Sequence, residues 1–102
     1  MCIHRPAKSS DRDYVKIISS STYCALSVIG RRGGKQLIRF DTTKSDCYNL
    51  KSVLHEFVHT IGFHHEHNRP DRDKYVTINW KCIQKNKTQH FNKGLFTYYI
   101  IT

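Results

Sequence analysis

The sequence contains little that would place it in a membrane or on a nucleic acid. No stretch of about 20 residues is apolar enough to form a transmembrane helix. The chain has no internal repeat, no low-complexity tract and no nucleic-acid-binding motif. The 17 basic residues outnumber the 8 acidic ones and give a formal net charge of +9. We interpret this charge as a solvated basic face. A cleft that favours acidic side chains is an alternative, and nucleic-acid binding is not expected.

The chain also has few hydrophobic residues from which to build a large core. Its 102 residues are 38% hydrophobic, which suits one small domain or part of one and leaves little apolar surface to bury. We therefore expect additional stabilisation from a metal ion or from disulfides. The four cysteines, Cys2, Cys24, Cys47 and Cys82, allow three full pairings, and four reduced thiols are the alternative. No two are spaced as Cys-x-x-Cys, so cysteines are not expected to ligate zinc.

Histidine, in contrast, is concentrated in one motif. Residues 55–65 read HEFVHTIGFHH, which fits the pattern H-E-x-x-H-x-x-G-x-x-H. On a helix, His55 and His59 lie on one face, about 6 Å apart, and can approach the same ion. Gly62 can take the backbone conformation that ends a helix, so the chain can turn and bring in His65 as a third ligand. Three imidazoles with an open fourth position are typical of a catalytic zinc site.

A carboxylate stands next to the first of these histidines. Glu56 can lie beside the ion without ligating it, where it can accept a proton from a zinc-activated water. His64 and His67 fall outside the ligand spacing, so we interpret them as surface residues or residues beside the site. The alternatives are a helix that carries surface histidines and, for Glu56, an ordinary surface carboxylate.

The longer stretch HEFVHTIGFHHEHNRPDRD resembles the signature HExxHxxGFxHExxRxDRD of the astacin family of zinc endopeptidases, in the metzincin clan. The resemblance extends from Cys2 to about Phe91. It implies one Zn²⁺ per chain, with His55, His59 and His65 as ligands and Glu56 as the general base.

The same resemblance implies that the protein hydrolyses internal bonds of protein or peptide substrates. It also implies a secreted protein, whose signal and pro-segment we expect to lie outside this chain, because residues 1–6 lack the apolar run of a signal. In a secreted protein the sequon at Asn86 could carry an N-glycan.

The family pattern also suggests roles for several flanking residues. It pairs Cys24 with Cys47 and gives Cys2 a partner beyond residue 102, while Cys82 has no counterpart. Closure of the Cys24–Cys47 loop would stabilise the fold by roughly 3 kcal/mol. The family's contact between Glu66 and a mature amino terminus has no counterpart here, so Glu66 is expected to pair with Arg69 or Arg72 or to face water. The Asp71-Arg72-Asp73 run is expected to be a structural charged turn.

The chain departs from the family pattern near its end. Metzincins carry a methionine turn downstream of the third histidine, but the only methionine here is Met1. Tyr98 and Tyr99 lie near the position of a family tyrosine without reproducing its context. We therefore expect residues 1–102 to be one partial peptidase domain, which holds the upper subdomain with the zinc helix and lacks the C-terminal subdomain. A non-catalytic zinc-binding fragment or decoy is an alternative, and a basic binding module with incidental histidines is another.

Hydrophobic patterns predict the elements of this domain. Residues 14–18, 25–29 and 36–40 are expected to be strands, and 76–80 a short extended segment. Asn49 is expected to cap a helix over 50–61, with an apolar face toward the core that consists of Leu50, Val53, Leu54, Phe57, Val58 and Ile61. Residues 81–93 could be helix or loop. The resemblance implies an α+β, zincin-like fold, with a small twisted mixed sheet packed on the helix that carries the zinc ligands.

Overall fold

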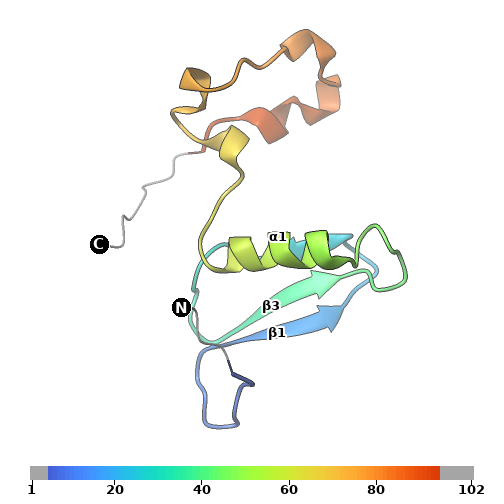
Figure 1. Ribbon diagram of the computed structural model, residues 1–102, viewed down its shortest axis with the longest axis vertical. Coiled ribbons are helices and arrows are strands. Elements are labelled where there is room, and N and C mark those ends of the chain that lie inside the picture. Colours follow the sequence, from blue (N-terminus) through green and yellow to red (C-terminus); the bar gives the residue numbers. More distant parts are fainter. Residues whose placement is uncertain (1–4, 95–102) are drawn as a thin grey trace. The chain divides into compact units, whose positions relative to one another are not determined.

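The computed structural model describes residues 5–94, which belong to two compact units (Figure 1). The first unit ends at Phe63 and the second begins at His64. Met1, Cys2, Tyr98 and Tyr99 lie outside the described residues, so the predictions that concern them stay predictions. None of the helices in the described part of the chain has the length and hydropathy that a membrane crossing requires.

A three-stranded mixed sheet forms the centre of the first unit (Figure 1). Its order is β1 (Tyr14–Ser19), β3 (Lys35–Phe40) and β2 (Ala25–Ser27), with β1 parallel and β2 antiparallel to β3. The central position of β3 explains its burial pattern, because both of its edges are paired. Gln36, Ile38 and Phe40 alternate along it and are all buried, as residues on one face of a strand should be.

The start of the helix is joined to this sheet by a covalent bond. Cys24, just before β2, forms a disulfide with Cys47, which confirms the pairing implied by the family resemblance. Helix α1 (Leu50–Thr60) then begins at Asn49, whose side-chain oxygen accepts a 3.0 Å hydrogen bond from the Ser52 N–H. This N-cap is the predicted one, because asparagine satisfies a backbone donor that the first helical turn leaves unpaired.

The far end of α1 also follows the sequence pattern. Ile61 is the C-cap, and Gly62 has a φ of +115°, a value that only glycine adopts at low cost. The Gly62 N–H donates a 2.9 Å hydrogen bond to the His59 carbonyl. The chain is thereby turned out of the helix three residues before His65.

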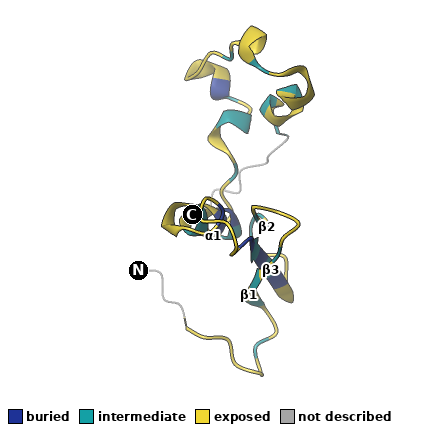
Figure 2. Ribbon diagram, turned by 90° about the vertical axis from the view of Figure 1, so that its right-hand side faces the viewer, coloured by how far each residue is buried: buried dark blue, intermediate teal, exposed yellow. Residues whose placement is uncertain are grey.

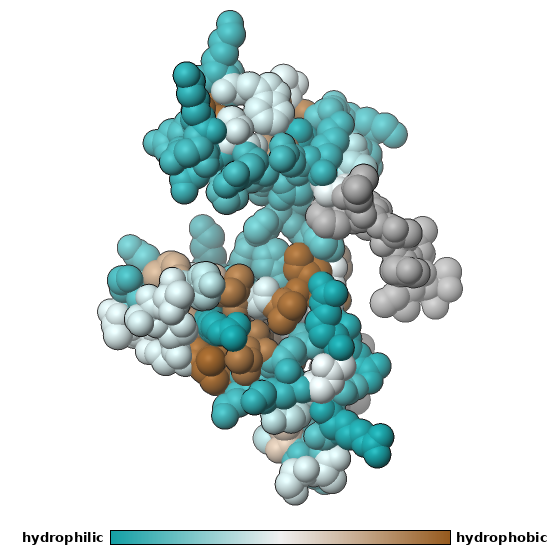
Figure 3. All heavy atoms as spheres, turned by 180° about the vertical axis from the view of Figure 1, so that it is seen from behind, coloured by the Kyte–Doolittle hydropathy of each residue, from teal (hydrophilic) through white to brown (hydrophobic). Residues whose placement is uncertain are grey.

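The predicted core face of α1 is wrong within this unit. Leu50, Leu54 and Ile61 are 74%, 56% and 63% exposed, whereas Glu56 and His59 are buried. The helix packs against β2, which is only three residues long and bonds to the Glu56 carbonyl through Ser27, so this strand is too short to bury a whole helical face. Figure 2 shows that much of α1 is exposed, and Figure 3 shows apolar side chains gathered on one surface of this unit.

The second unit contains only short helices in the part that the structure describes. Four 3₁₀ helices follow one another: Glu66–Asn68, Arg72–Lys74, Trp80–Cys82 and Lys85–Phe91. The prediction for 81–93 left helix and loop open, and the residues form 3₁₀ turns joined by short loops. Residues 76–79 belong to no helix or strand, and Trp80 starts a 3₁₀ helix, so the predicted extended segment ends before it.

Candidate metal centre

Two of the predicted ligands face each other on α1. The Nε2 atoms of His55 and His59 are 3.0 Å apart, and the rings meet edge to face at 85°. Two nitrogen ligands bound tetrahedrally to one zinc ion stand about 3.3 Å apart. The two histidines therefore already have nearly the spacing that a shared ion requires, as the four-residue separation on a helix predicts.

A backbone carbonyl fixes which nitrogen of His59 can bind metal. The Nδ1 atom lies 2.7 Å from the carbonyl oxygen of Phe63, and a carbonyl oxygen can only accept a hydrogen bond. Nδ1 therefore carries the hydrogen in the neutral ring, and Nε2 presents its lone pair toward His55. The sequence pattern did not indicate this role of Phe63. Gly62 is the only sequence signal for it, because the turn at this glycine brings the Phe63 carbonyl back to the helix.

His65 is the third predicted metal ligand. It is the N-cap of the 3₁₀ helix Glu66–Asn68 and is exposed. It completes the ligand spacing of the motif in the sequence, and in the structure it belongs to the second unit. Three neutral imidazoles are a donor set that zinc accepts readily, so the residues fit the predicted ion.

Glu56 occupies a protected position next to this group. Glu56 is only 6% exposed. Its backbone carbonyl accepts hydrogen bonds from the hydroxyls of Ser27 on β2 and Thr60 on α1, both at 3.0 Å. Together with His55 it lines a cleft of about 500 Å³ in the first unit. The remaining lining comes from the start of β2 and the beginning of the helix, and consists of Cys24, Ala25, Asp46, Asn49, Lys51 and Ser52. Glu56 thus combines low exposure with a place in the lining of this cleft.

The charged residues after His65 form ion pairs within the second unit. Glu66 accepts a 3.0 Å hydrogen bond from the Arg69 guanidinium, one of the partners expected for it. Arg69 also pairs with Asp71 through two bonds, and this contact lowers the pKa of the Asp71 carboxyl. Arg72 is buried and donates to the carbonyl of His67. These contacts are those expected of a structural charged turn.

Comparison with known proteins places this arrangement in a family. Residues 1–97 match the family model for Astacin, which describes a family of peptidases. The chain is 39% identical to zinc metalloproteinase nas-8 of Steinernema carpocapsae over 88 residues, which is 86% of this chain and 20% of that protein. It is 35% identical to low choriolytic enzyme of Oryzias latipes over 93 residues, which is 91% of this chain and 33% of that protein.

A solved structure gives the same result for the fold. High choriolytic enzyme 1 of Oryzias latipes, a hatching enzyme zinc-protease, superposes with a TM-score of 0.71 at 33% identity. The match covers 85% of this chain and 42% of that one, so the chain spans less than half the length of this structure and a third or less of the relatives above. The predicted α+β, zincin-like fold is thereby confirmed. Zinc is the cofactor of this family, and the chain carries three histidines in the spacing predicted for its ligands. The chain belongs to the astacin family of peptidases.

Proposed function

We propose that this chain is the zinc-binding part of a secreted endopeptidase of the metzincin clan, which hydrolyses internal bonds of protein or peptide substrates. His55, His59 and His65 would hold one zinc ion, and Glu56 would be the general base. The observation that supports this most directly is the geometry of the two helical histidines. Their facing Nε2 atoms, with the His59 tautomer fixed by Phe63, form a pair prepared for a metal.

In the proposed reaction, the zinc ion acts as the Lewis acid and the protein chain supplies the group that transfers protons. When bound, zinc supplies a Lewis acid that lowers the pKa of a water to about 7 and polarises the carbonyl to be cleaved. Glu56 accepts the proton of the attacking water and returns it to the nitrogen of the departing amine. Glu56 follows the proposed ligand His55 directly and lines the cleft together with it, which supports this role.

The sheet supplies a complementary position for the substrate backbone. Strand β2 lies at an edge of the sheet, and Ala25 on it lines the cleft with Glu56. An extended peptide could add to this edge through main-chain hydrogen bonds. We assign this position to the substrate on the family resemblance and on the neighbourhood of β2 and Glu56.

Two further features support a secreted protein. The Cys24–Cys47 disulfide is typical of an oxidising compartment. Asn86, in the sequon Asn86-Lys87-Thr88, is exposed and so is open to glycosylation in that compartment.

Zinc binding and hydrolysis are tested by two variants of the full chain. We expect one zinc ion per chain by elemental analysis and its loss in His59→Ala, because that variant removes the buried ligand. Glu56→Ala should retain zinc but lose zinc-dependent cleavage of a quenched fluorescent peptide. Full cleavage by Glu56→Ala would contradict the proposed base. Zinc binding without any cleavage by the unsubstituted chain would support the alternative of a non-catalytic zinc-binding fragment.

A further inference from the structure

The ring of His67 lies against the ring of His65. The two imidazoles are stacked, with centroids 5.5 Å apart and planes at 15° to each other. Residues that are two positions apart, as these are, do not face each other in a regular α-helix. That rule does not apply here, because His65 is the cap of the 3₁₀ helix and has an extended backbone, while His67 is inside the helix.

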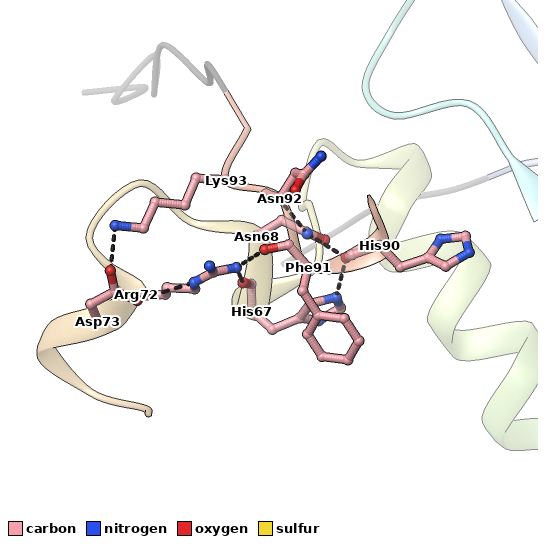
Figure 4. Close-up of polar contacts among 8 residues, drawn as sticks. All are labelled: His67, Asn68, Arg72, Asp73, His90, Phe91, Asn92 and Lys93. Atoms are coloured by element: carbon pink, nitrogen blue, oxygen red, sulfur yellow. Dashed lines mark hydrogen bonds and ion pairs between the residues drawn. The ribbon is translucent and has the colours of Figure 1, made fainter. Parts of the chain in front are cut away.

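His67 is itself held in place by three contacts (Figure 4). Its Nε2 atom lies 3.0 Å from the carbonyl oxygen of His90, and its ring packs on Phe91 at a centroid distance of 5.2 Å. Its own carbonyl accepts a 2.9 Å hydrogen bond from the Arg72 guanidinium. The ring is thus held by a polar contact of its Nε2 atom, by the tilted Phe91 ring and through its backbone.

The segment that holds His67 is anchored in turn. Asn68 donates to the carbonyl oxygens of His90 and Asn92 at 2.7 and 2.8 Å, and its own carbonyl accepts from Gly94 at 2.8 Å. Arg72 also donates to the Phe91 carbonyl. Figure 4 shows these bonds meeting at the backbone between His90 and Asn92, while the His90 side chain points away from them.

The contact with His90 also defines what His67 can do chemically. Because the His90 carbonyl only accepts, the Nε2 atom of His67 carries a hydrogen and offers no lone pair to a metal. His67 is therefore suited to support a neighbouring ring and not to ligate through that atom. Residues that orient metal ligands through contacts outside the coordination sphere typically change metal affinity about 10- to 100-fold when they are replaced.

We propose that His67 is a positioning residue for the metal centre, which uses its anchored ring to hold the imidazole of His65 in the orientation needed for zinc. This inference rests on the proposed role of His65 as a ligand. It assigns a task to the ring of Phe91 and to a backbone carbonyl, that of residue 90, which lie far along the chain from the motif: they hold the ring that holds the third ligand.

Zinc affinity of the full chain, measured by competition with a chromophoric chelator, tests the proposal. His67→Ala should weaken zinc binding about tenfold, chiefly through faster dissociation, because the His65 ring loses the surface it stacks on. His67→Phe should stay within about threefold of the unsubstituted chain, because it keeps a flat ring at this position that can contact both Phe91 and His65. His67→Leu fills similar space without a flat ring and should resemble His67→Ala.

The matched control is His90→Ala. It removes a side chain that points away from His67 but keeps the carbonyl that His67 contacts, so zinc affinity should not change. If circular dichroism shows that His67→Ala does not fold, the zinc affinities of His67→Leu and His67→Phe are compared with each other instead. Equal affinity in the Leu and Phe variants, or in a folded His67→Ala and the unsubstituted chain, would overturn the proposal. If the proposed zinc site itself is wrong, the unsubstituted chain will bind no zinc, and this result differs from any outcome that contradicts the role of His67 alone.

Discussion

The N–H of Gly30 donates a 2.9 Å hydrogen bond to the carbonyl of His59, the same oxygen that accepts from Gly62. The turn after the edge strand is thereby attached to the backbone of a proposed metal ligand. Gly30 has a φ of +71°, and a Cβ built on it would stand 3.9 Å from the Gly62 Cα, so space does not forbid a side chain there. The positive φ, and not a lack of space, is what disfavours a side chain at Gly30.

We therefore expect Gly30→Ala to lower the free energy of unfolding by about 1–2 kcal/mol, because an alanine at positive φ is strained. Gly30→Asn is the control, since asparagine tolerates this region better, and it should cost clearly less. Urea unfolding followed by circular dichroism measures both. Equal losses in the two variants would show that the side chain, and not the backbone conformation, is responsible.

Asp41 makes the stability of the first unit depend on acid. Its side chain is buried, accepts hydrogen bonds from the Thr43 hydroxyl and backbone N–H, and pairs with Lys44 at 2.9 Å. The Thr43 hydroxyl above all, and then Lys44, lower the pKa of the Asp41 carboxyl from 3.8 to about 2. A carboxyl with a lowered folded pKa stabilises the fold fully above its unfolded pKa, near 3.8, and this stabilisation is lost as the pH falls toward 2.

Denaturation at a series of pH values checks this assignment. The slope of unfolding free energy across the interval between the two pKa values should be shallower in Asp41→Asn than in the unsubstituted chain. Thr43→Val, which keeps the carboxyl but removes the hydroxyl that bonds to it, should move the acid transition to higher pH. An unchanged slope in Asp41→Asn would assign the acid sensitivity to other carboxyls.

Arg72 is a buried residue that joins several parts of the second unit. It is 5% exposed, it donates to the carbonyls of His67 and Phe91, and its guanidinium lies 5.7 Å from the centre of the Trp80 ring. Arg72→Lys keeps the charge but loses the planar, multi-donor guanidinium that bonds both carbonyls and lies near the indole. We expect it to destabilise this unit by about 1–3 kcal/mol, the usual cost of leaving a buried polar group without its partner.

The readout for Arg72→Lys is the fluorescence of Trp80, the only tryptophan in the chain, during urea unfolding. Lys93→Gln is a suitable control, because it removes a basic residue that pairs with Asp73 on the surface. Surface pairs of this kind contribute about 0–1 kcal/mol. If both variants shifted the Trp80 transition equally, net charge would explain the effect and the buried contacts would not.

The elements nearest the motif could be predicted from sequence because their signals are local. Asn49 caps the helix through a bond to the residue three positions on, and Gly62 ends it through its own backbone freedom. The spacing of His55 and His59 likewise fixes their relation on a single helix. Such features depend on few neighbours, so the sequence pattern is sufficient for them.

Features that depend on distant parts of the chain could not be predicted in the same way. The stack of His65 on His67 is supported by the carbonyl of His90, which no side-chain pattern encodes. Three of the four 3₁₀ helices in the described part of the chain have only three residues, which is too short for a hydrophobic period to show in the sequence. Trp80 is for this reason predicted in an extended segment, although it begins a 3₁₀ helix.

Helix α1 provides the sharpest contrast between sequence pattern and structure. Periodicity places Leu54 in the core, where its replacement by alanine would cost about 2–5 kcal/mol. In the structure Leu54 is 56% exposed, so we expect Leu54→Ala to change the free energy of unfolding by no more than about 0.5 kcal/mol. Ile38, on the central strand, is 1% exposed and provides the matched comparison.

We expect Ile38→Ala to cost the full amount for a core residue, because the cavity is enclosed by the sheet and cannot collapse freely. Urea unfolding of the two variants at equal protein concentration gives the comparison directly. A large loss for Leu54→Ala would mean that its side chain is covered in solution, and repetition over a range of protein concentrations would show whether a second copy provides the cover. Equal and small losses would mean that β3 does not form the core described above.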